Sequence, residues 1–179
     1  LSLLNEKLND KKNSGVVFPT AKVSLVGDLE EIYMENTNIN NSKEIYREKL
    51  FNSRSLDSLR RTTSLGPHRT ELIVEYEEKE IPAYLCSTGE QKGLLISIIL
   101  AAVRASKDFH GKSPILLLDE VFAHLDDIQR DALSSEILDI ETQAWMTSTE
   151  ASHYMTFGRK SYIINLNNID KSSYDLRHK

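Results

Sequence analysis

An apolar run that ends in two carboxylates is the first part of this sequence that could do chemistry. Residues 115–118 are followed directly by Asp119 and Glu120, which predicts a buried strand whose carboxyl end reaches the surface. Ligands collect at that edge of an open α/β sheet. One carboxylate there can hold Mg²⁺, and a second can position water for attack on a phosphate. A buried strand that simply ends in a solvated acidic turn explains the same residues equally well.

The start of a strongly apolar helical pattern at residue 87 is the second candidate. Ser87 and Glu90 have the spacing of a capping box, in which each side chain binds the backbone N–H of the other residue. A helix start preceded by Ser-Thr-Gly also offers free N–H groups and a positive dipole end to an anion, and Gly89 would let a phosphate approach the backbone. No residues downstream complete a phosphate site, which suggests a nucleotide held by another subunit.

The elements expected around these residues alternate in type. After the helix that starts near residue 87, the pattern predicts a strand at 115–118, an amphipathic helix at 127–140, and short buried strands at 142–150 and 162–166. This alternation predicts an α/β fold with a parallel sheet, and Trp145 is expected in its core. Upstream we expect a strand that ends near Gly27, a helix capped by Ser42, and two strands on either side of residues 77–80.

The character of the chain changes near residue 64. Residues 1–64 are mostly helical and polar, with one or two strands, and residues 65–179 carry the α/β pattern. The chain starts at Leu1 rather than Met, and we interpret it as a fragment. The net charge of −5 gives no global sign of nucleic-acid binding. The single cysteine, Cys86, excludes an internal disulfide, and no apolar run is long enough to span a membrane.

The candidate motifs occur in the order found in ABC-type ATPases. The Ser-x-Gly-Glu-Gln helix start resembles their signature motif, and Asp119-Glu120 at a strand tip resembles Walker B. Residues 123–126 resemble the D-loop, and residues 146–150 fall where that class has its switch residue. With the sequence LGPHRTEL at 65–72 ahead of them, these motifs resemble the C-terminal half of the RecF family, SMC/Rad50-like ATPases of bacterial recombination and repair. The resemblance covers about 18–166.

The resemblance implies a role for each candidate residue. Five residues would face, in trans, an ATP held by the other subunit of a dimer: Ser87, Thr88, Gly89, Glu90 and Gln91. Asp119 would serve Mg²⁺, and Glu120 would be the catalytic residue that positions or activates water. Asp126 would cross the dimer interface. Thr147 or Ser148 would sense the γ-phosphate, and the motifs do not distinguish them.

The sequence departs from the family pattern in three places. The family often has Asp-Asp at the strand tip, where this chain has Asp119-Glu120, and a shorter carboxylate is more usual at Glu150. An acidic pair is typical where Thr70 and Glu71 follow Arg69. His68 and Arg69 are as consistent with fixing the turn after Pro67 as with a functional role. Arg60 and Arg61 could contact DNA phosphate, although a solvated helix end is the favoured interpretation.

The phosphate-binding loop G-x-x-x-x-G-K-[ST], or Walker A, occurs nowhere in the chain. The family has that loop near the N-terminus, so the resemblance implies that the segment lies before this chain begins. We therefore expect the C-terminal half of an ABC-type head with a parallel sheet core, made by residues 65–179. Residues 1–64 would be part of a helical arm or lid. The isolated chain is expected to be unable to hydrolyse ATP.

The family resemblance also implies a biological role. It predicts a cytoplasmic DNA repair and recombination protein of the SOS response, which uses ATP and Mg²⁺ and forms an ATP-dependent homodimer. It would bind single-stranded DNA and single-strand/double-strand junctions, and assist recombinase loading with mediators of the RecR/RecO type. One alternative is another SMC/Rad50-like head, although the chain lacks long heptad runs. A second is a degenerate interaction domain that does not hydrolyse ATP.

Overall fold

The computed structural model describes residues 1–10, 17–36, 38–123 and 125–166. The chain forms two compact units, Leu1–Ala105 and Ser106–Lys179, and the division between them falls within one helix, Thr88–His110. The domain boundary expected near residue 64 remains a prediction. None of the described helices is both long enough and apolar enough to cross a bilayer.

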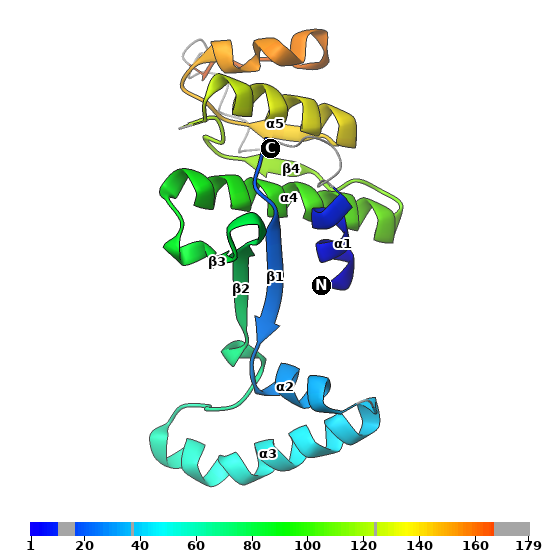
Figure 1. Cartoon of the computed structure of the whole chain (residues 1–179), viewed down its shortest axis with the longest axis vertical. Helices are drawn as coiled ribbons and strands as arrows, with labels where there is room; N and C mark the ends of the chain where they lie inside the picture. The colour runs from blue at the N-terminus through cyan, green and yellow to red at the C-terminus, as the bar shows by residue number, and fades with distance from the viewer. Residues whose placement is uncertain (11–16, 37, 124, 167–179) are drawn as a thin grey trace, which may run out of the picture. The chain divides into compact units, whose positions relative to one another are not determined.

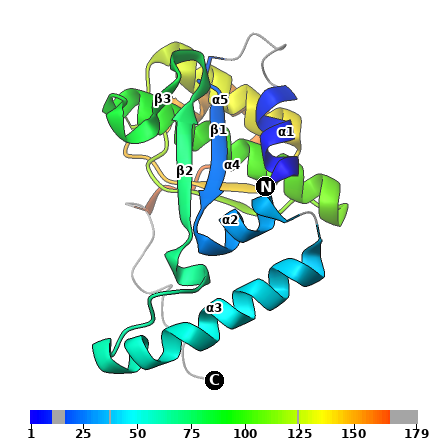
Figure 2. The same ribbon diagram turned by 60° about the horizontal axis from the view of Figure 1, so that its bottom comes forward.

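The first unit contains a three-stranded antiparallel sheet in the order β1-β2-β3, formed by Ala21–Val26, Glu71–Tyr76 and Ile81–Pro82. β1 and β2 pair along their full length, from Ala21 opposite Tyr76 to Val26 opposite Glu71, and run side by side in Figures 1 and 2. β2 and β3 are joined by a single 3-10 turn, Glu77–Lys79, which ends at Glu80 in the left-handed region. The strand before Gly27 and the two strands around residues 77–80 are confirmed.

Two helices cover this sheet and form the core of the first unit. They are α1, Ser2–Asp10, and α4, Thr88–His110. The buried cluster consists of Leu8, Ala21, Val23, Cys86, Leu94 and Ala101. Asn5 fastens α1 to β1, because its side-chain amide donates to the Val23 carbonyl across 2.7 Å and accepts from the Val23 N–H across 3.0 Å. Burial of each leucine side chain in this cluster contributes about 1.5–3 kcal/mol to the stability of the fold.

Two further helices, α2 (Asp28–Glu35) and α3 (Ile39–Arg60), follow β1 and pack against each other. The expectation that Ser42 caps α3 is wrong. Asn38 is the cap, since its side chain accepts from the Asn40 N–H across 2.9 Å, and the helix has already begun at Ile39. Ser42 is instead buried one turn inside the helix, where its hydroxyl bonds back to the Asn38 carbonyl. Asparagine is as good a capping residue as serine, and Asn38 lies earlier in the same Asn-rich stretch, so the helix starts after it.

The second unit contains a two-stranded parallel sheet. β4, Leu116–Leu118, pairs with β5, Ala144–Met146, and the crossover between them carries α5, Asp127–Ile140. A 3-10 segment, Ala151–Lys160, follows β5 and packs against α5. The predicted parallel pairing and the helix at 127–140 are confirmed.

Two expectations about the second unit are wrong. Trp145 is 55% exposed, not in the core: it stands opposite Leu117, which is 74% exposed, on the more exposed face of the sheet. Strand side chains alternate between faces, so the covered face takes Leu116 and Leu118 instead. Residues 162–166 form no strand, because no described strand pairs with them to bind their backbone groups.

Candidate functional site

The two carboxylates after β4 are joined by hydrogen bonds to the residue that follows β5. The N–H of Thr147 donates to the carbonyl of Leu118 across 3.0 Å, which continues the parallel pairing one step beyond the strands. This places the Thr147 hydroxyl within hydrogen-bonding distance of both Asp119 and Glu120. It donates to Asp119 Oδ1 across 2.5 Å and accepts from the Glu120 N–H across 2.9 Å. A single side chain therefore fixes both positions of the acidic turn.

Glu120 has an unusual backbone conformation, with φ at +44°. Outside glycine, residues held in such sparsely populated regions cost on the order of 1–3 kcal/mol, and they occur disproportionately at active sites and switches. The turn is closed by a hydrogen bond of 3.0 Å from the Ala123 N–H to the Glu120 carbonyl. The N–H of Glu120 donates to the Thr147 hydroxyl. The exposed Glu120 side chain is thus carried on a backbone held from both ends.

Ser148 points into a different set of contacts. Its hydroxyl lies 2.7 Å from His153 Nδ1 and accepts from the Glu150 N–H across 3.2 Å. His153 in turn packs against the ring of the fully buried Phe122. Ser148 therefore organises the start of the segment after β5, whereas Thr147 is the hydroxyl that the fold brings to the carboxylates. Sequence spacing carried no signal for His153.

Asp126 is occupied by a local role. Its Oδ1 accepts from the Gln129 N–H across 2.7 Å, and the Gln129 side chain accepts from the Asp126 N–H across 3.2 Å. This reciprocal pair is a capping box at the start of α5. The expected place of Asp126 at a dimer interface remains a prediction. His124, in the same D-loop-like turn, lies outside the described residues.

The capping box predicted at the start of α4 is confirmed. Glu90 Oε2 accepts from the N–H and the hydroxyl of Ser87 across 2.8 and 2.7 Å, and the Glu90 N–H approaches the Ser87 hydroxyl at 3.4 Å. The other Glu90 oxygen binds the ammonium group of Lys79, from the turn before β3. The bond from Lys79, followed by those from Ser87, lowers the pKa of Glu90 to about 2. The bond to Glu90 raises the pKa of Lys79. No pattern in the sequence singles out Lys79.

Thr88 and Gly89 form the open part of this helix start. Both residues are exposed, and within the described chain their N–H groups have no acceptor. A Cβ added at Gly89 would meet no atom within 4 Å, so the space beside the backbone is free. Gln91 differs, because its side-chain amide donates to the Ala83 carbonyl across 3.0 Å and the Cys86 carbonyl across 3.2 Å. Gln91 therefore holds the preceding turn, and its phosphate contact remains a prediction.

The residues of the sequence GPHR form a compact turn, Pro67–Arg69, ahead of β2. Gly66 has φ of +151°, a conformation that other residues rarely adopt. His68 Nε2 lies 3.1 Å from the Thr63 carbonyl oxygen, and the Arg69 guanidinium donates to the same oxygen across 3.4 Å. Both side chains thus tie the turn to the loop that follows α3, as the turn-fixing interpretation requires.

The donors near Asp119 suit one kind of metal ion. Among the residues that the structure describes, no three His, Cys, Asp or Glu side chains cluster as a protein-only metal site. Asp119 and the Thr147 hydroxyl offer hard oxygen atoms from one carboxylate and one alcohol. Mg²⁺ is commonly bound in that manner, through one or two carboxylates, with waters and substrate phosphates completing its shell. The residues present therefore fit Mg²⁺ in the presence of a nucleotide.

Comparison with known proteins gives a consistent result. No protein-family profile matches the chain. The DNA replication and repair protein RecF of Mesorhizobium japonicum is 42% identical over 147 residues, which are 82% of this chain and 38% of that protein. RecF of Rickettsia canadensis is 36% identical over 166 residues, or 93% of this chain and 45% of that protein. RecF of Rickettsia bellii is 37% identical over 169 residues.

A solved structure shares the fold. The recombination mediator protein RecF-ATPrS of the RecFOR pathway matches with a TM-score of 0.64 and 21% sequence identity, over 86% of this chain and 40% of that one. This chain thus spans less than half the length of the RecF proteins that it matches. Its α/β fold with a parallel sheet is that of part of RecF. By sequence and by fold, the chain is a homologue of the DNA replication and repair proteins of the RecF family.

Proposed function

We propose that this chain is the part of a RecF-type ATPase that carries the signature motif, Walker B, the D-loop and the switch. In the intact protein, two copies dimerise on ATP at a DNA single-strand/double-strand junction in the cytoplasm and assist recombinase loading with RecR/RecO-type mediators. The homology to proteins of DNA replication and repair supports the DNA role. The relative of similar fold, described as RecF-ATPrS of the RecFOR pathway, supports a nucleotide and mediator partners.

The observation that carries the proposal is the hydrogen-bonding of Thr147 to both residues of the acidic turn. Asp119 would face Mg²⁺, which would neutralise phosphate charge when bound. Glu120 would position the attacking water. The Glu120 backbone is held by the hydrogen bond from its N–H to the Thr147 hydroxyl. A phosphate oxygen that binds the Thr147 hydroxyl would compete with Asp119 for it. The switch residue would thereby report the γ-phosphate to both carboxylates.

The start of α4 supplies the other half of the proposed chemistry. The N–H groups of Thr88 and Gly89 are free to bind an anion held by a second copy of the protein, and the helix dipole favours that charge. Glu90 would oppose a phosphate by its own negative charge. Its ion pair with Lys79 reduces that opposition, so the pair makes the helix start compatible with an anion.

The test is the mass in solution of an intact RecF-type protein that carries this sequence, measured with and without ATP and Mg²⁺. We expect an ATP-dependent dimer that Ser87→Arg abolishes and Glu120→Gln traps, because the first blocks the helix start and the second stops turnover. Ser135→Arg, at an exposed position of α5, is the matched control and should leave dimerisation unchanged. A monomer under all conditions, or a dimer indifferent to ATP and to Ser87→Arg, would contradict the proposal.

The isolated chain is expected to show no ATP turnover, because it contains no G-x-x-x-x-G-K-[ST] loop to hold the α- and β-phosphates. Phosphate release by the purified 179-residue chain measures this directly. Turnover that persists after Glu120→Gln would identify a contaminant. Turnover that disappears with Glu120→Gln would show that the chain hydrolyses ATP alone and that this part of the proposal is wrong.

A further inference from the structure

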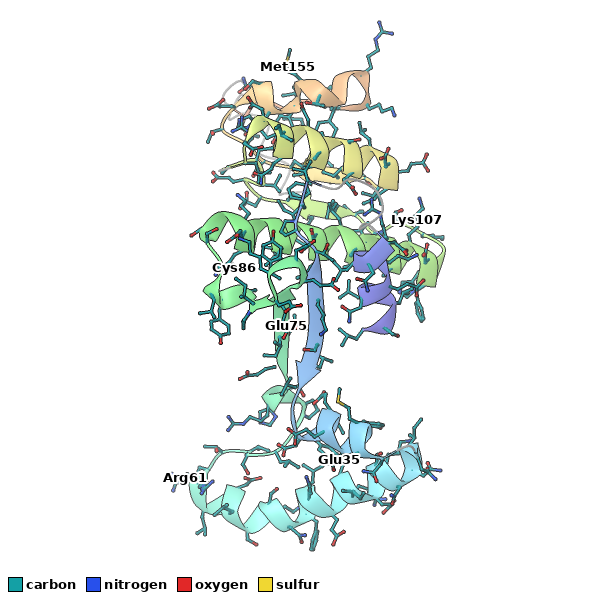
Figure 3. All side chains as sticks on the ribbon, in the orientation of Figure 1. Glu35, Arg61, Glu75, Cys86, Lys107 and Met155 are labelled. Atoms are coloured by element: carbon teal, nitrogen blue, oxygen red, sulfur yellow. The ribbon has the colours of Figure 1, made fainter. Side chains whose placement is uncertain are left out.

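The far end of α3 and the turn after it carry a local excess of positive charge. Residues 49–70 contain five Lys or Arg and one Asp, although the whole chain has a net charge of −5. Three of these side chains and His68 belong to one place in the first unit, which we call the basic corner: Arg60, Arg61, His68 and Arg69. All four are exposed. Figure 3 labels Arg61 at this end of α3.

The basic corner is held together by hydrogen bonds rather than by chance proximity. Arg61 ends α3 in the left-handed region, with its N–H bonded to the Asp57 carbonyl. Two residues after Arg61, the Thr63 carbonyl accepts from Arg69 and lies 3.1 Å from His68 Nε2. The loop after α3 and the turn before β2 are therefore joined, and the arginines of both are presented together.

The one acidic residue of the segment is bonded within its own helix end and loop. The carboxylate of Asp57 accepts from the Ser64 N–H and hydroxyl across 3.0 and 2.5 Å, and from the Ser53 hydroxyl across 3.1 Å. These bonds, with the Ser64 hydroxyl first, and the nearby charge of Arg60 keep the pKa of Asp57 low. Its charge thus fastens the loop. Within the described residues, no member of the basic corner is in an ion pair with a carboxylate.

Structural roles account for part of this arrangement. Cations near a helix C-terminus interact favourably with the helix dipole, which accounts for Arg60 and Arg61. The bonds of His68 and Arg69 to the Thr63 carbonyl tie their turn to the loop after α3, and neither role requires the three guanidinium groups to be exposed at one place. Core formation does not explain α3 either, since Ser42 is its only buried residue among 22. Leu59, beside Arg60, is 83% exposed. Figures 1 and 2 show α3 as a long helix at the end of the β1–β2 ribbon, and it packs beside α2.

We infer that the basic corner is a binding site for the phosphate backbone of DNA. A polyanion is the partner that three exposed arginines beside a fixed turn would bind, and planar guanidinium groups match phosphate geometry. Acidic residues border the site on one side, where Glu30 accepts from the Thr70 hydroxyl and Glu71 begins β2. They limit the site to the face of Arg60, Arg61 and Arg69. This inference rests on the proposed DNA role and assigns it a location.

The experiment measures binding of the 179-residue chain to a fluorescently labelled DNA duplex with a single-stranded extension, by anisotropy at several salt concentrations. The variant combines Arg60→Gln, Arg61→Asn and Arg69→Gln. Asparagine is chosen at Arg61 because it tolerates the left-handed backbone there. The matched control removes three other exposed charges of the first unit through Lys22→Gln, Lys43→Gln and Arg47→Gln.

We expect the corner variant to bind about a hundredfold more weakly at low salt, and its salt slope to fall by about one for each phosphate contact removed. The control, with the same net charge, should stay within a few-fold of the unchanged chain. Equal thermal unfolding midpoints for both variants would show that folding is intact. Equal binding losses in both variants, or no binding by the unchanged chain, would overturn the inference.

Two further readouts separate this inference from its alternatives. If the corner variant changes self-association in sedimentation but DNA binding is unchanged, the surface contacts a second copy and the inference is wrong. In the intact RecF-type protein, the corner variant should still dimerise on ATP. If it does so but binds DNA normally, only the location of the DNA site fails. If Ser87→Arg has no effect while the corner variant loses DNA, only the proposed ATP site fails.

Discussion

The hydroxyl of Thr147 donates to the carboxylate of Asp119 across 2.5 Å, although the two residues are 28 positions apart in the chain. They meet because β4 and β5 are parallel and end at the same edge, so that the residues just beyond them become neighbours. The same hydroxyl accepts from the Glu120 N–H, which makes Thr147 the residue on which the acidic turn depends.

Removal of that hydroxyl should therefore affect stability and nucleotide response together. Thr147→Val keeps the shape of the side chain but loses both hydrogen bonds, and we expect the free energy of unfolding to fall by about 1 kcal/mol. Thr147→Ser retains the hydroxyl and should lie close to the unchanged chain. Urea unfolding measures the first effect. In the intact RecF-type protein, single-turnover ATP hydrolysis should fall at least about tenfold for Thr147→Val, about 1.4 kcal/mol in the barrier.

Ser148→Ala is the control for Thr147, since it removes a neighbouring hydroxyl whose contacts are His153 and the Glu150 N–H. We expect it to lower stability and to leave ATP hydrolysis within a few-fold of normal. If the effects on hydrolysis were reversed, Ser148 rather than Thr147 would be the switch residue.

Two glycines of α4 should respond in opposite ways to the same substitution. Gly89→Ala adds a methyl group to open space and should raise the free energy of unfolding by about 0.5 kcal/mol, because alanine favours the helix. Gly93→Ala would bring its methyl group to 2.8 Å from Pro19 Cδ, in the buried packing of the first unit, and should cost about 1–3 kcal/mol. Thermal or urea unfolding of the 179-residue chain measures both.

The stabilised Gly89→Ala variant also tests the proposed phosphate site. In the intact protein its methyl group would stand where the phosphate must approach the backbone, so ATP-dependent dimerisation should weaken although the fold is more stable. A Gly89→Ala protein that dimerises normally would show that no ligand comes close to this helix start.

The ion pair of Glu90 predicts a pH dependence. Its pKa is lowered from 4.5 to about 2 in the folded chain, so the ionised carboxylate favours the folded state. That contribution is complete above pH 4.5 and is lost as the pH falls from 4.5 to about 2. The difference in unfolding free energy between the unchanged chain and Glu90→Gln should therefore shrink through this window.

Lys79→Met provides the matched test of that cause. Lys79 is the largest contributor to the low pKa of Glu90, so its removal should move the Glu90 titration upward towards 4.5. NMR titration of the Glu90 carboxylate measures this directly. An unchanged titration in Lys79→Met would mean that Ser87 alone sets the pKa of Glu90.

Asp126 allows its local role to be separated from its proposed role at an interface. Asp126→Ala removes the cap of α5 and should cost about 1 kcal/mol of stability, whereas Asp126→Asn keeps a capping oxygen and should cost much less. If Asp126 also crosses a dimer interface through its charge, Asp126→Asn should weaken ATP-dependent dimerisation of the intact protein at near-normal stability. Normal dimerisation of Asp126→Asn would mean that Asp126 only caps α5 and has no role at the interface.

Much of the local structure followed from the sequence because its causes are local. The capping spacing of Ser87 and Glu90, and the apolar run that precedes Asp119, are set by neighbours along the chain. Ser42 shows the limit of such reasoning, because several polar residues in an Asn-rich stretch could cap α3 and the sequence does not rank them. Trp145 and residues 162–166 show another limit, since burial and strand pairing depend on which elements lie alongside.

The sequence by itself determined the order of the motifs, the alternation of helices and strands, and the residue types available for binding a phosphate or a metal. Only the tertiary structure decided which of these residues meet. It joined Thr147, and not Ser148, to Asp119, brought Lys79 to Glu90, and gathered Arg61 and Arg69 at one turn. The physical reason is that spacing along a chain fixes periodicity and caps, whereas contacts between distant residues are fixed by strand register and helix packing.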